Sequence, residues 1–147
     1  LAETNCMSDR TFVDTNILIY AHDADAKAKQ ETAKSVLGEL WSQETGVLSM
    51  QVLQEFYVNV TRKIATPLSR SAARLIVSSY SVWCIQTTHA EISMAFQIED
   101  EVRIGFWDAL IVAAAVKCGA TRILSEDLNS GQMIAGIRIE NPFAKLH

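Results

Sequence analysis

The chain has 147 residues, of which 49% are hydrophobic and 20% charged, with only 6 Gly and 2 Pro. This length suits one domain with a substantial core, and the composition excludes a disordered or fibrous protein. The longest uninterrupted apolar stretch, residues 109–116, is less than half of what a membrane-spanning helix needs. Lys and Arg total 13 against 17 Asp and Glu, a net charge of −4, which excludes nucleic-acid binding through overall positive charge.

Cysteine usage and the chain ends complete the general description. The 3 cysteines are few and widely spaced, at Cys6, Cys84 and Cys118. They argue against a disulfide scaffold or a zinc site, and we expect a reducing, cytoplasmic setting. Residues 1–8 show no periodicity and Met7 resembles a native start, so we expect a disordered or artificial N-terminal extension there. We expect residues 9–147 to form a single domain.

Predicted strands and helices alternate along the chain. Short apolar runs predict strands at residues 11–13, 47–48, 82–85, 122–124 and 137–139. Apolar residues spaced three and four apart predict helices at residues 26–41, 50–64, 70–80, 88–101 and 107–118. Ser49, Ser69 and Thr88 can cap three of these helices, and Gly119 ends the last one. This alternation predicts an α/β fold with a mainly parallel sheet covered on both faces.

Four acidic residues lie where the predicted strands end or where neighbouring helices begin. Asp14 ends the first strand, and Asp127 follows the fourth. Asp108 stands at the start of the apolar last helix, and Glu55 lies near the start of the helix after the second strand. Ligands of open parallel sheets bind at the carboxyl ends of the strands. We therefore expect these residues, called the four acids below, to share one edge of the sheet.

Each of the four acids also has a structural explanation. Asp14 and Asp108 could be helix N-caps, a role that Asp favours. Glu55 lies opposite the apolar stripe of its helix, which is typical of a solvated face. Asp127 could be a turn residue. No single one of them establishes a site.

The combination of the four acids points to a cation. Two carboxylates ~5 Å apart repel by roughly 3 kcal/mol at an effective dielectric constant of ~20. Several such pairs would offset much of the ~5–15 kcal/mol net stability of a domain, so some acids must be protonated or bind a cation. Oxygen ligands without a His or Cys cluster favour Mg²⁺ or Mn²⁺ over zinc. Such an ion can activate water and neutralise a phosphoryl oxygen.

Four blocks of sequence carry a family resemblance. In chain order they are FVDTNIL at 12–18, QEF at 54–56, WDALI at 107–111 and LSEDL at 124–128. In this order and spacing they resemble the PIN-domain nucleases, and in particular the VapC-type toxins of prokaryotic toxin–antitoxin pairs. The similarity covers about residues 10–143. It implies a three-layer α/β/α sandwich with a mainly parallel sheet of about five strands, Mg²⁺-dependent RNA cleavage, frequent homodimerisation and inhibition by a cognate antitoxin.

The resemblance also implies roles for individual residues. The family's catalytic and metal-binding acids correspond here to Asp14, Glu55, Asp108 and Asp127. Positions that support those acids by hydrogen bonds correspond to Asn16 and Ser125. Glu126 is an additional acid without an assigned role. These correspondences predict a ribonuclease that hydrolyses RNA phosphodiester bonds with Mg²⁺, or with Mn²⁺ as a substitute.

RNA contacts and alternative functions are less defined. The densest basic group lies on two consecutive predicted helices: Arg62, Lys63, Arg70 and Arg74. These side chains could contact RNA, or they could form a solvated helix face. Trp107 falls at core spacing, and we expect it to be buried rather than stacked on a base. The alternatives are a non-catalytic RNA-binding or protein-binding module and an Mg²⁺-binding phospho-acceptor signalling domain.

Overall fold

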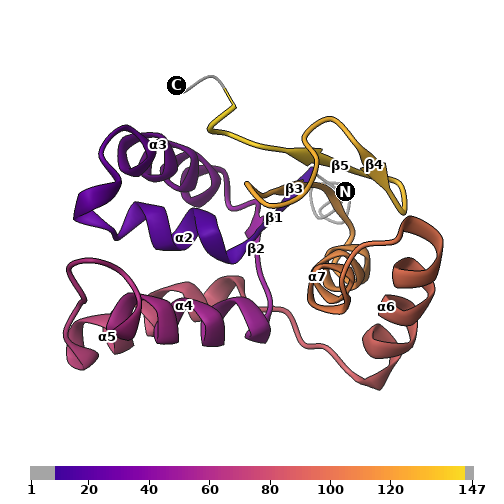
Figure 1. The fold of residues 1–147 in the computed structure, drawn as a ribbon, viewed down its shortest axis with the longest axis horizontal. Coiled ribbons are helices and arrows are strands. Elements are labelled where there is room, and N and C mark those ends of the chain that lie inside the picture. Colours follow the sequence, from indigo (N-terminus) through magenta and orange to yellow (C-terminus); the bar gives the residue numbers. More distant parts are fainter. Residues whose placement is uncertain (1–8, 145–147) are drawn as a thin grey trace, which may run out of the picture.

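The fold is shown in Figure 1 as a computed structural model that describes residues 9–144. Its sheet has five strands in the order β2-β1-β3-β5-β4. The strands are β1 Arg10–Val13, β2 Gly46–Val47, β3 Ala120–Leu124, β4 Met133–Ile134 and β5 Ile137–Glu140. The first three pairings in that order are parallel, and β4 pairs with β5 in the antiparallel direction. The predicted extension at residues 1–8 lies outside the described residues.

Six α-helices and two short 3₁₀ turns connect the strands within the described part of the chain. The helices are α2 Thr15–Ala21, α3 Ala28–Gln43, α4 Met50–Arg62, α5 Arg70–Tyr80, α6 His89–Val102 and α7 Phe106–Lys117. The 3₁₀ turns are η1 Ala24–Ala26 and η2 Ser81–Trp83. No helix within residues 9–144 is long and apolar enough to cross a membrane.

The order of the connections places helices on both faces of the sheet. From β1 the chain passes through α2 and α3 to β2, and from β2 it returns through α4 to α7 to β3, on the other side of β1. Because parallel crossovers are right-handed, two crossovers that run in opposite directions cover opposite faces. Figure 1 shows α2 and α3 on one side of the strands and α6 and α7 on the other. The predicted three-layer α/β fold is confirmed.

The core lies between the sheet and these helices. Phe12 in β1, Ile123 in β3 and Ile139 in β5 have no exposed surface. Helix α7 buries apolar residues around most of its circumference, including Ala113 and Ala115, as its apolar sequence predicts. The helix ends before Gly119, whose φ of +72° lies in the left-handed region that glycine adopts readily.

Two of the three predicted helix caps are confirmed. Ser69 Oγ accepts a hydrogen bond of 3.1 Å from Ala72 N. Thr88 and Glu91 form the reciprocal capping box at the start of α6. Ser49 does precede α4, but its buried Oγ has no hydrogen-bond partner within residues 9–144. Ser49 thus occupies the predicted N-cap position of α4, but its side chain makes no capping hydrogen bond.

The strand predicted at residues 82–85 is wrong. This stretch begins in the 3₁₀ turn η2, and only Cys84 forms an isolated bridge, to Leu48. Its apolar character serves a different purpose, because Trp83 inserts into the core and is only 7% exposed. The fifth strand of the sheet is instead β4, which the sequence did not predict. Helix α2 was also missed, since its seven residues are too few to show a clear period.

Candidate active site

Asp14 occupies the junction between β1 and α2. Its Oδ1 accepts a hydrogen bond of 2.7 Å from Thr15 N, so it is the N-cap of α2. Its Oδ2 accepts a second hydrogen bond of 2.7 Å, from Ser125 Oγ. The side chain is only 5% exposed. The carboxylate of Asp14 is therefore an N-cap and a candidate active-site group at once. The capping conformation directs it toward Ser125, at the end of β3.

Ser125 connects the ends of the two central strands. It follows β3, is completely buried, and its Oγ accepts a hydrogen bond of 3.1 Å from Asp127 N while donating to Asp14. Because β1 and β3 are parallel neighbours, their carboxyl ends meet at the same edge of the sheet. One hydroxyl thus positions one acid directly and orients the backbone of a second.

Asn16 links the same two acids through its side-chain amide. Its Nδ2 donates to Asp127 Oδ2 at 3.1 Å and, more weakly, to Asp14 Oδ2 at 3.5 Å. Its Oδ1 accepts a hydrogen bond of 3.1 Å from Glu126 N. Asn16 therefore holds the loop after β3 against the start of α2, with the exposed Asp127 carboxylate at the surface.

Glu55 approaches this edge from α4. Its Oε1 accepts a hydrogen bond of 2.6 Å from Thr15 Oγ1, and its Oε2 accepts one of 3.3 Å from Gln51 Nε2. Gln51 also donates to the carbonyl oxygen of Trp107 at 3.4 Å, next to Asp108. Glu55 is half-buried and held in place, so the solvated-face explanation does not describe it.

Sequence reasoning missed Thr15 and Gln51. Gln51 precedes Glu55 by four residues in a helix, a spacing that places two side chains on the same face. That spacing could have revealed the contact between Gln51 and Glu55. The contact of Thr15 with Glu55 spans 40 positions of the chain and had no such signal.

Electrostatic interactions connect Asp14 and Asp108 to the other two acids. Burial raises the pKa of Asp14 from 3.8 to about 6, hydrogen bonds from Ser125 and Thr15 oppose this, and the charges of Asp127 and Glu55 raise it further. The pKa of Asp108 is also raised, first by partial burial and then by the charges of Asp127 and Glu55. Asp127 and Glu55 thus influence both of the other acids. The structure places all four acids at one edge of the sheet.

The arrangement fits a partly hydrated hard cation better than an enclosed metal cage. Among residues 9–144, no three His, Cys, Asp or Glu side chains converge closely enough to hold a metal ion by themselves. Mg²⁺ keeps several waters and commonly binds through one or two carboxylates. Burial is the main cause of the raised pKa of Asp14, and the negative charges of Asp127 and Glu55 add to it. Carboxylate oxygens with excess negative charge are the donors that such an ion prefers.

Glu126 is directed away from the four acids. It accepts a hydrogen bond of 2.6 Å from Tyr20 OH and forms an ion pair with Lys29. Partial burial would raise the pKa of Glu126, but the bonds from Lys29 and Tyr20 outweigh this and lower it. Glu126 therefore anchors the loop that carries Asp127 to helices α2 and α3.

The basic group and Trp107 are placed differently from the acids. Arg62, Lys63, Arg70 and Arg74 are all exposed, at the end of α4 and along α5. Arg62 lies about 10 Å along the axis of α4 from Glu55, at 1.5 Å per residue. Trp107 is 64% exposed, so the expectation that it is buried is wrong. It lies in the first turn of α7, next to Asp108.

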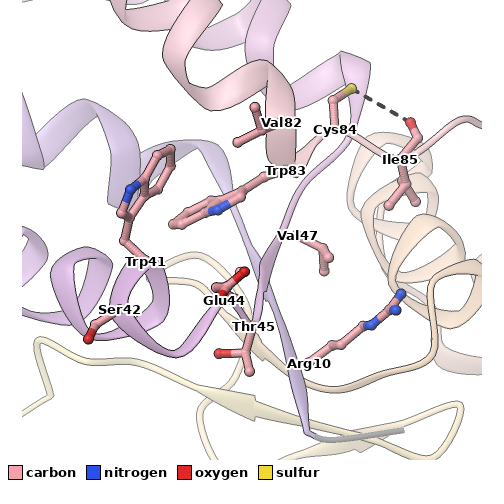
Figure 2. Close-up of a pocket in the computed structure, with 11 residues that line it drawn as sticks. Arg10, Trp41, Ser42, Glu44, Thr45, Val47, Val82, Trp83, Cys84 and Ile85 are labelled. Atoms are coloured by element: carbon pink, nitrogen blue, oxygen red, sulfur yellow. Dashed lines mark hydrogen bonds between the residues drawn. The ribbon is translucent and has the colours of Figure 1, made fainter. Parts of the chain in front are cut away.

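A large hollow elsewhere on the molecule is separate from this edge. It has a volume of about 700 Å³ and includes Arg10 and Gly46, at the amino-terminal ends of β1 and β2. Figure 2 shows the indoles of Trp41 and Trp83 together on one side of it, with ring centroids 4.9 Å apart. The four acids lie at the opposite edge of the sheet, where the parallel strands have their carboxyl ends, so this hollow is not the candidate active site.

Comparison with known proteins places the chain in a family. The PIN domain family model matches residues 11–132. That match covers most of the chain and includes all four acids, so this protein belongs to the PIN domain family. A comparison with curated proteins gave no match.

Solved structures share the same fold. A toxin–antitoxin complex from Klebsiella pneumoniae matches with 19% identity and a TM-score of 0.64, over 90% of this chain and 97% of that one. FitAB bound to an IR36 DNA fragment matches with 17% identity and a TM-score of 0.65, over 93% and 98%. VapC20 of Mycobacterium tuberculosis, a sarcin-ricin loop cleaving toxin, matches with 20% identity and a TM-score of 0.60, over 87% and 98%.

Proposed function

We propose that this PIN-domain protein is an Mg²⁺-dependent endoribonuclease and the toxin of a toxin–antitoxin pair. The observation that carries the proposal is the hydrogen-bonded unit of Asp14, Ser125, Asn16 and Asp127, with Glu55 and Asp108 beside it. Membership of the PIN domain family supports nuclease chemistry. The shared fold of VapC20, whose description names it a sarcin-ricin loop cleaving toxin, supports RNA as the substrate.

The four acids would hold the metal ion and the attacking water. Asp14 and Asp108 would be the principal ligands, with Asp127 and Glu55 bound directly or through water. When bound, Mg²⁺ supplies neutralisation of phosphate charge and a lower pKa for a coordinated water. Ser125 and Asn16 keep the carboxylates of Asp14 and Asp127 in fixed orientations. The carboxylates orient the water and accept its proton, so no separate histidine base is needed.

The test is cleavage of structured RNA by the purified chain. We expect cleavage with Mg²⁺ or Mn²⁺, none with EDTA, and none with Asp108→Asn in either ion. Asp100→Asn, at an exposed position on α6, is the matched control and should cleave like the parent. Equal cleavage in EDTA, or full activity of Asp108→Asn, would overturn the metal mechanism. RNA binding without cleavage under every condition would instead support the non-catalytic module.

We also propose a cognate antitoxin, a homodimer and action in the cytoplasm. The shared fold of the Klebsiella pneumoniae toxin–antitoxin complex supports the first of these. An arginine of the antitoxin would block the acidic edge, because its planar charged group pairs with carboxylates in bidentate fashion. A groove of about 490 Å³ between α4 and α5, lined by Leu53, Tyr57 and Val77 among others, suits an apolar helix face of that partner.

Co-expression with a neighbouring small gene product tests the partner. We expect a stable complex, restored growth and suppressed RNA cleavage. The mass of the purified chain in solution tests the homodimer separately. A partner that binds tightly but leaves cleavage unchanged would contradict the blocking model and leave the nuclease proposal intact.

A further inference from the structure

Trp107 is an exposed aromatic side chain at the edge of the acid site. Its side chain is 64% exposed, whereas Ala109, two residues later in α7, is completely buried. Consecutive residues of a helix point in different directions, so Asp108 and Trp107 share the same turn but present different faces. The indole thus lies at the surface, and the next residue along the chain, Asp108, is one of the four acids.

Contacts from two sides hold Trp107 in place. The ring of Phe106 meets the indole edge-on, with centroids 5.2 Å apart and an interplanar angle of 73°. Gln51 Nε2 donates to the carbonyl oxygen of Trp107 and also to Glu55 Oε2. The backbone of Trp107 is therefore connected to the acid site, while most of its side chain stays exposed.

The negative charge at this edge favours an RNA contact that does not depend on attraction to phosphate. The four acids and the net charge of −4 repel an RNA backbone, and the basic residue Arg62 lies about 10 Å away along α4. Proteins that bind single-stranded RNA stack its bases on aromatic rings in addition to contacting its phosphates, and stacking is not weakened by negative charge nearby. Trp107 and Asp108 are consecutive in the first turn of α7, and Gln51 bonds both the Trp107 carbonyl oxygen and Glu55, so the indole stands on backbone that borders the four acids.

A second copy of the chain is a poorer occupant for this surface. Self-association across the edge would bring the four acids of one copy toward those of the other. Juxtaposed like charges in an interface cost several kcal/mol in general. Phe96, 52% exposed on α6 and 5.8 Å from Phe106, belongs to the same apolar patch but is not adjacent to an acid in sequence.

We propose that the indole of Trp107 binds an unpaired nucleobase by stacking and so positions the RNA strand at the four acids. This inference rests on the proposed ribonuclease function and adds to it a substrate-binding residue. It also names the substrate class as RNA with an unpaired base next to the cleaved bond. Because stacking is stronger for purines, Trp107 favours a purine at that position.

Binding of short single-stranded oligomers tests the proposal in the full chain. All proteins carry Asp108→Asn to prevent cleavage, and the RNA probes are oligoadenylate, oligouridylate and an abasic ribose-phosphate oligomer of equal length. We expect Trp107→Ala to weaken oligoadenylate binding by about 5- to 150-fold, the range for loss of one stacked base. Binding of the abasic oligomer should change little, and the preference for adenylate over uridylate should disappear. Trp107→Phe should keep most of the affinity.

Phe96→Ala is the matched control, because it removes an exposed ring of the same patch and should leave RNA binding unchanged. Equal weakening on the abasic oligomer would overturn stacking, and so would unchanged binding by Trp107→Ala where the parent binds. The nuclease proposal would survive both results. A change in sedimentation from dimer to monomer with Trp107→Ala would also overturn the stacking proposal, in favour of an interface between copies. If the unaltered chain does not cleave RNA, and the Asp108→Asn protein with Trp107 intact does not bind it, both the nuclease proposal and the stacking proposal are overturned.

Discussion

The side-chain amide of Asn16 joins the two ends of the acid site, donating to Asp127 Oδ2 at 3.1 Å and accepting from Glu126 N at the same distance. These bonds span 111 and 110 positions of the chain. They connect the first turn of α2 to the loop after β3. Asn16 is therefore placed to determine where the Asp127 carboxylate lies, although it carries no charge.

Replacing Asn16 by Ala should lower the rate of RNA cleavage about 10- to 100-fold, a typical effect of removing a group that orients a metal ligand. The Mg²⁺ concentration needed for half-maximal rate should rise, because Asp127 loses its fixed orientation. Initial rates measured over a range of Mg²⁺ concentrations check this. Asn129→Ala, at an exposed position two residues beyond Asp127, is the control. Equal losses in the two variants would contradict a specific role for Asn16.

Asp14→Asn should stabilise the metal-free protein at alkaline pH. The pKa of Asp14 is raised in the folded state, to about 6 from 3.8, so its contribution favours folding below pH 4 and is lost as the pH rises through 6. Above that range the charged carboxylate costs about 3 kcal/mol, which the amide avoids. Urea denaturation in EDTA should show a more stable variant at pH 8. The difference should vanish below pH 4, and a large destabilisation at pH 8 would show that the hydrogen bond from Ser125 to the carboxylate outweighs the cost of its charge, since Asn caps a helix as well as Asp does.

Glu126→Gln should weaken the anchor of the active-site loop. The pKa of Glu126 is lowered in the folded state, so the ion pair with Lys29 stabilises the fold above the ordinary pKa of 4.5 and is lost as the pH falls. Both side chains are partly exposed, so the effect at pH 7 should be at most about 1 kcal/mol. Denaturation at pH 7 and pH 3 measures it, with Glu39→Gln on the exposed face of α3 as the control. A loss that persists at pH 3 would contradict the ionic origin.

Gly46→Ala should destabilise the protein through a contact with Trp83. A Cβ at this position would lie 2.8 Å from three atoms of the indole ring, which is buried and cannot move freely. Overpacking of this kind typically costs about 1–3 kcal/mol. Thermal denaturation measures the loss, and the loss should shrink when Trp83→Leu removes the ring.

Gly38→Ala provides the matched control for that variant. Among the described residues, nothing lies within 4 Å of a Cβ built at Gly38 in α3. An alanine in a helix interior is favoured over glycine by about 0.5–1 kcal/mol, so this variant should be slightly more stable than the parent. Equal destabilisation by both alanines would contradict the steric explanation.

The amino-acid sequence by itself determined most of the elements and the edge of the sheet at which the acids meet. Hydrophobic periodicity and helix capping are local properties, so α4, α5, α6 and α7 were predicted close to their observed bounds. The positions of Asp14 and Asp127 follow from the same pattern, because carboxyl ends of parallel strands share an edge. The family resemblance added Asn16 and Ser125, whose hydrogen bonds to these acids the structure describes.

The tertiary structure was needed wherever a residue's role depends on a distant partner. The apolar run at residues 82–85 has the composition of a strand, but core packing of Trp83 makes it a 3₁₀ turn followed by one bridge. The contact of Thr15 with Glu55 and the outward direction of Trp107 likewise depend on how α4 and α7 meet the end of β1. Periodicity reports which face of an element is apolar, whereas packing between elements determines what each side chain contacts.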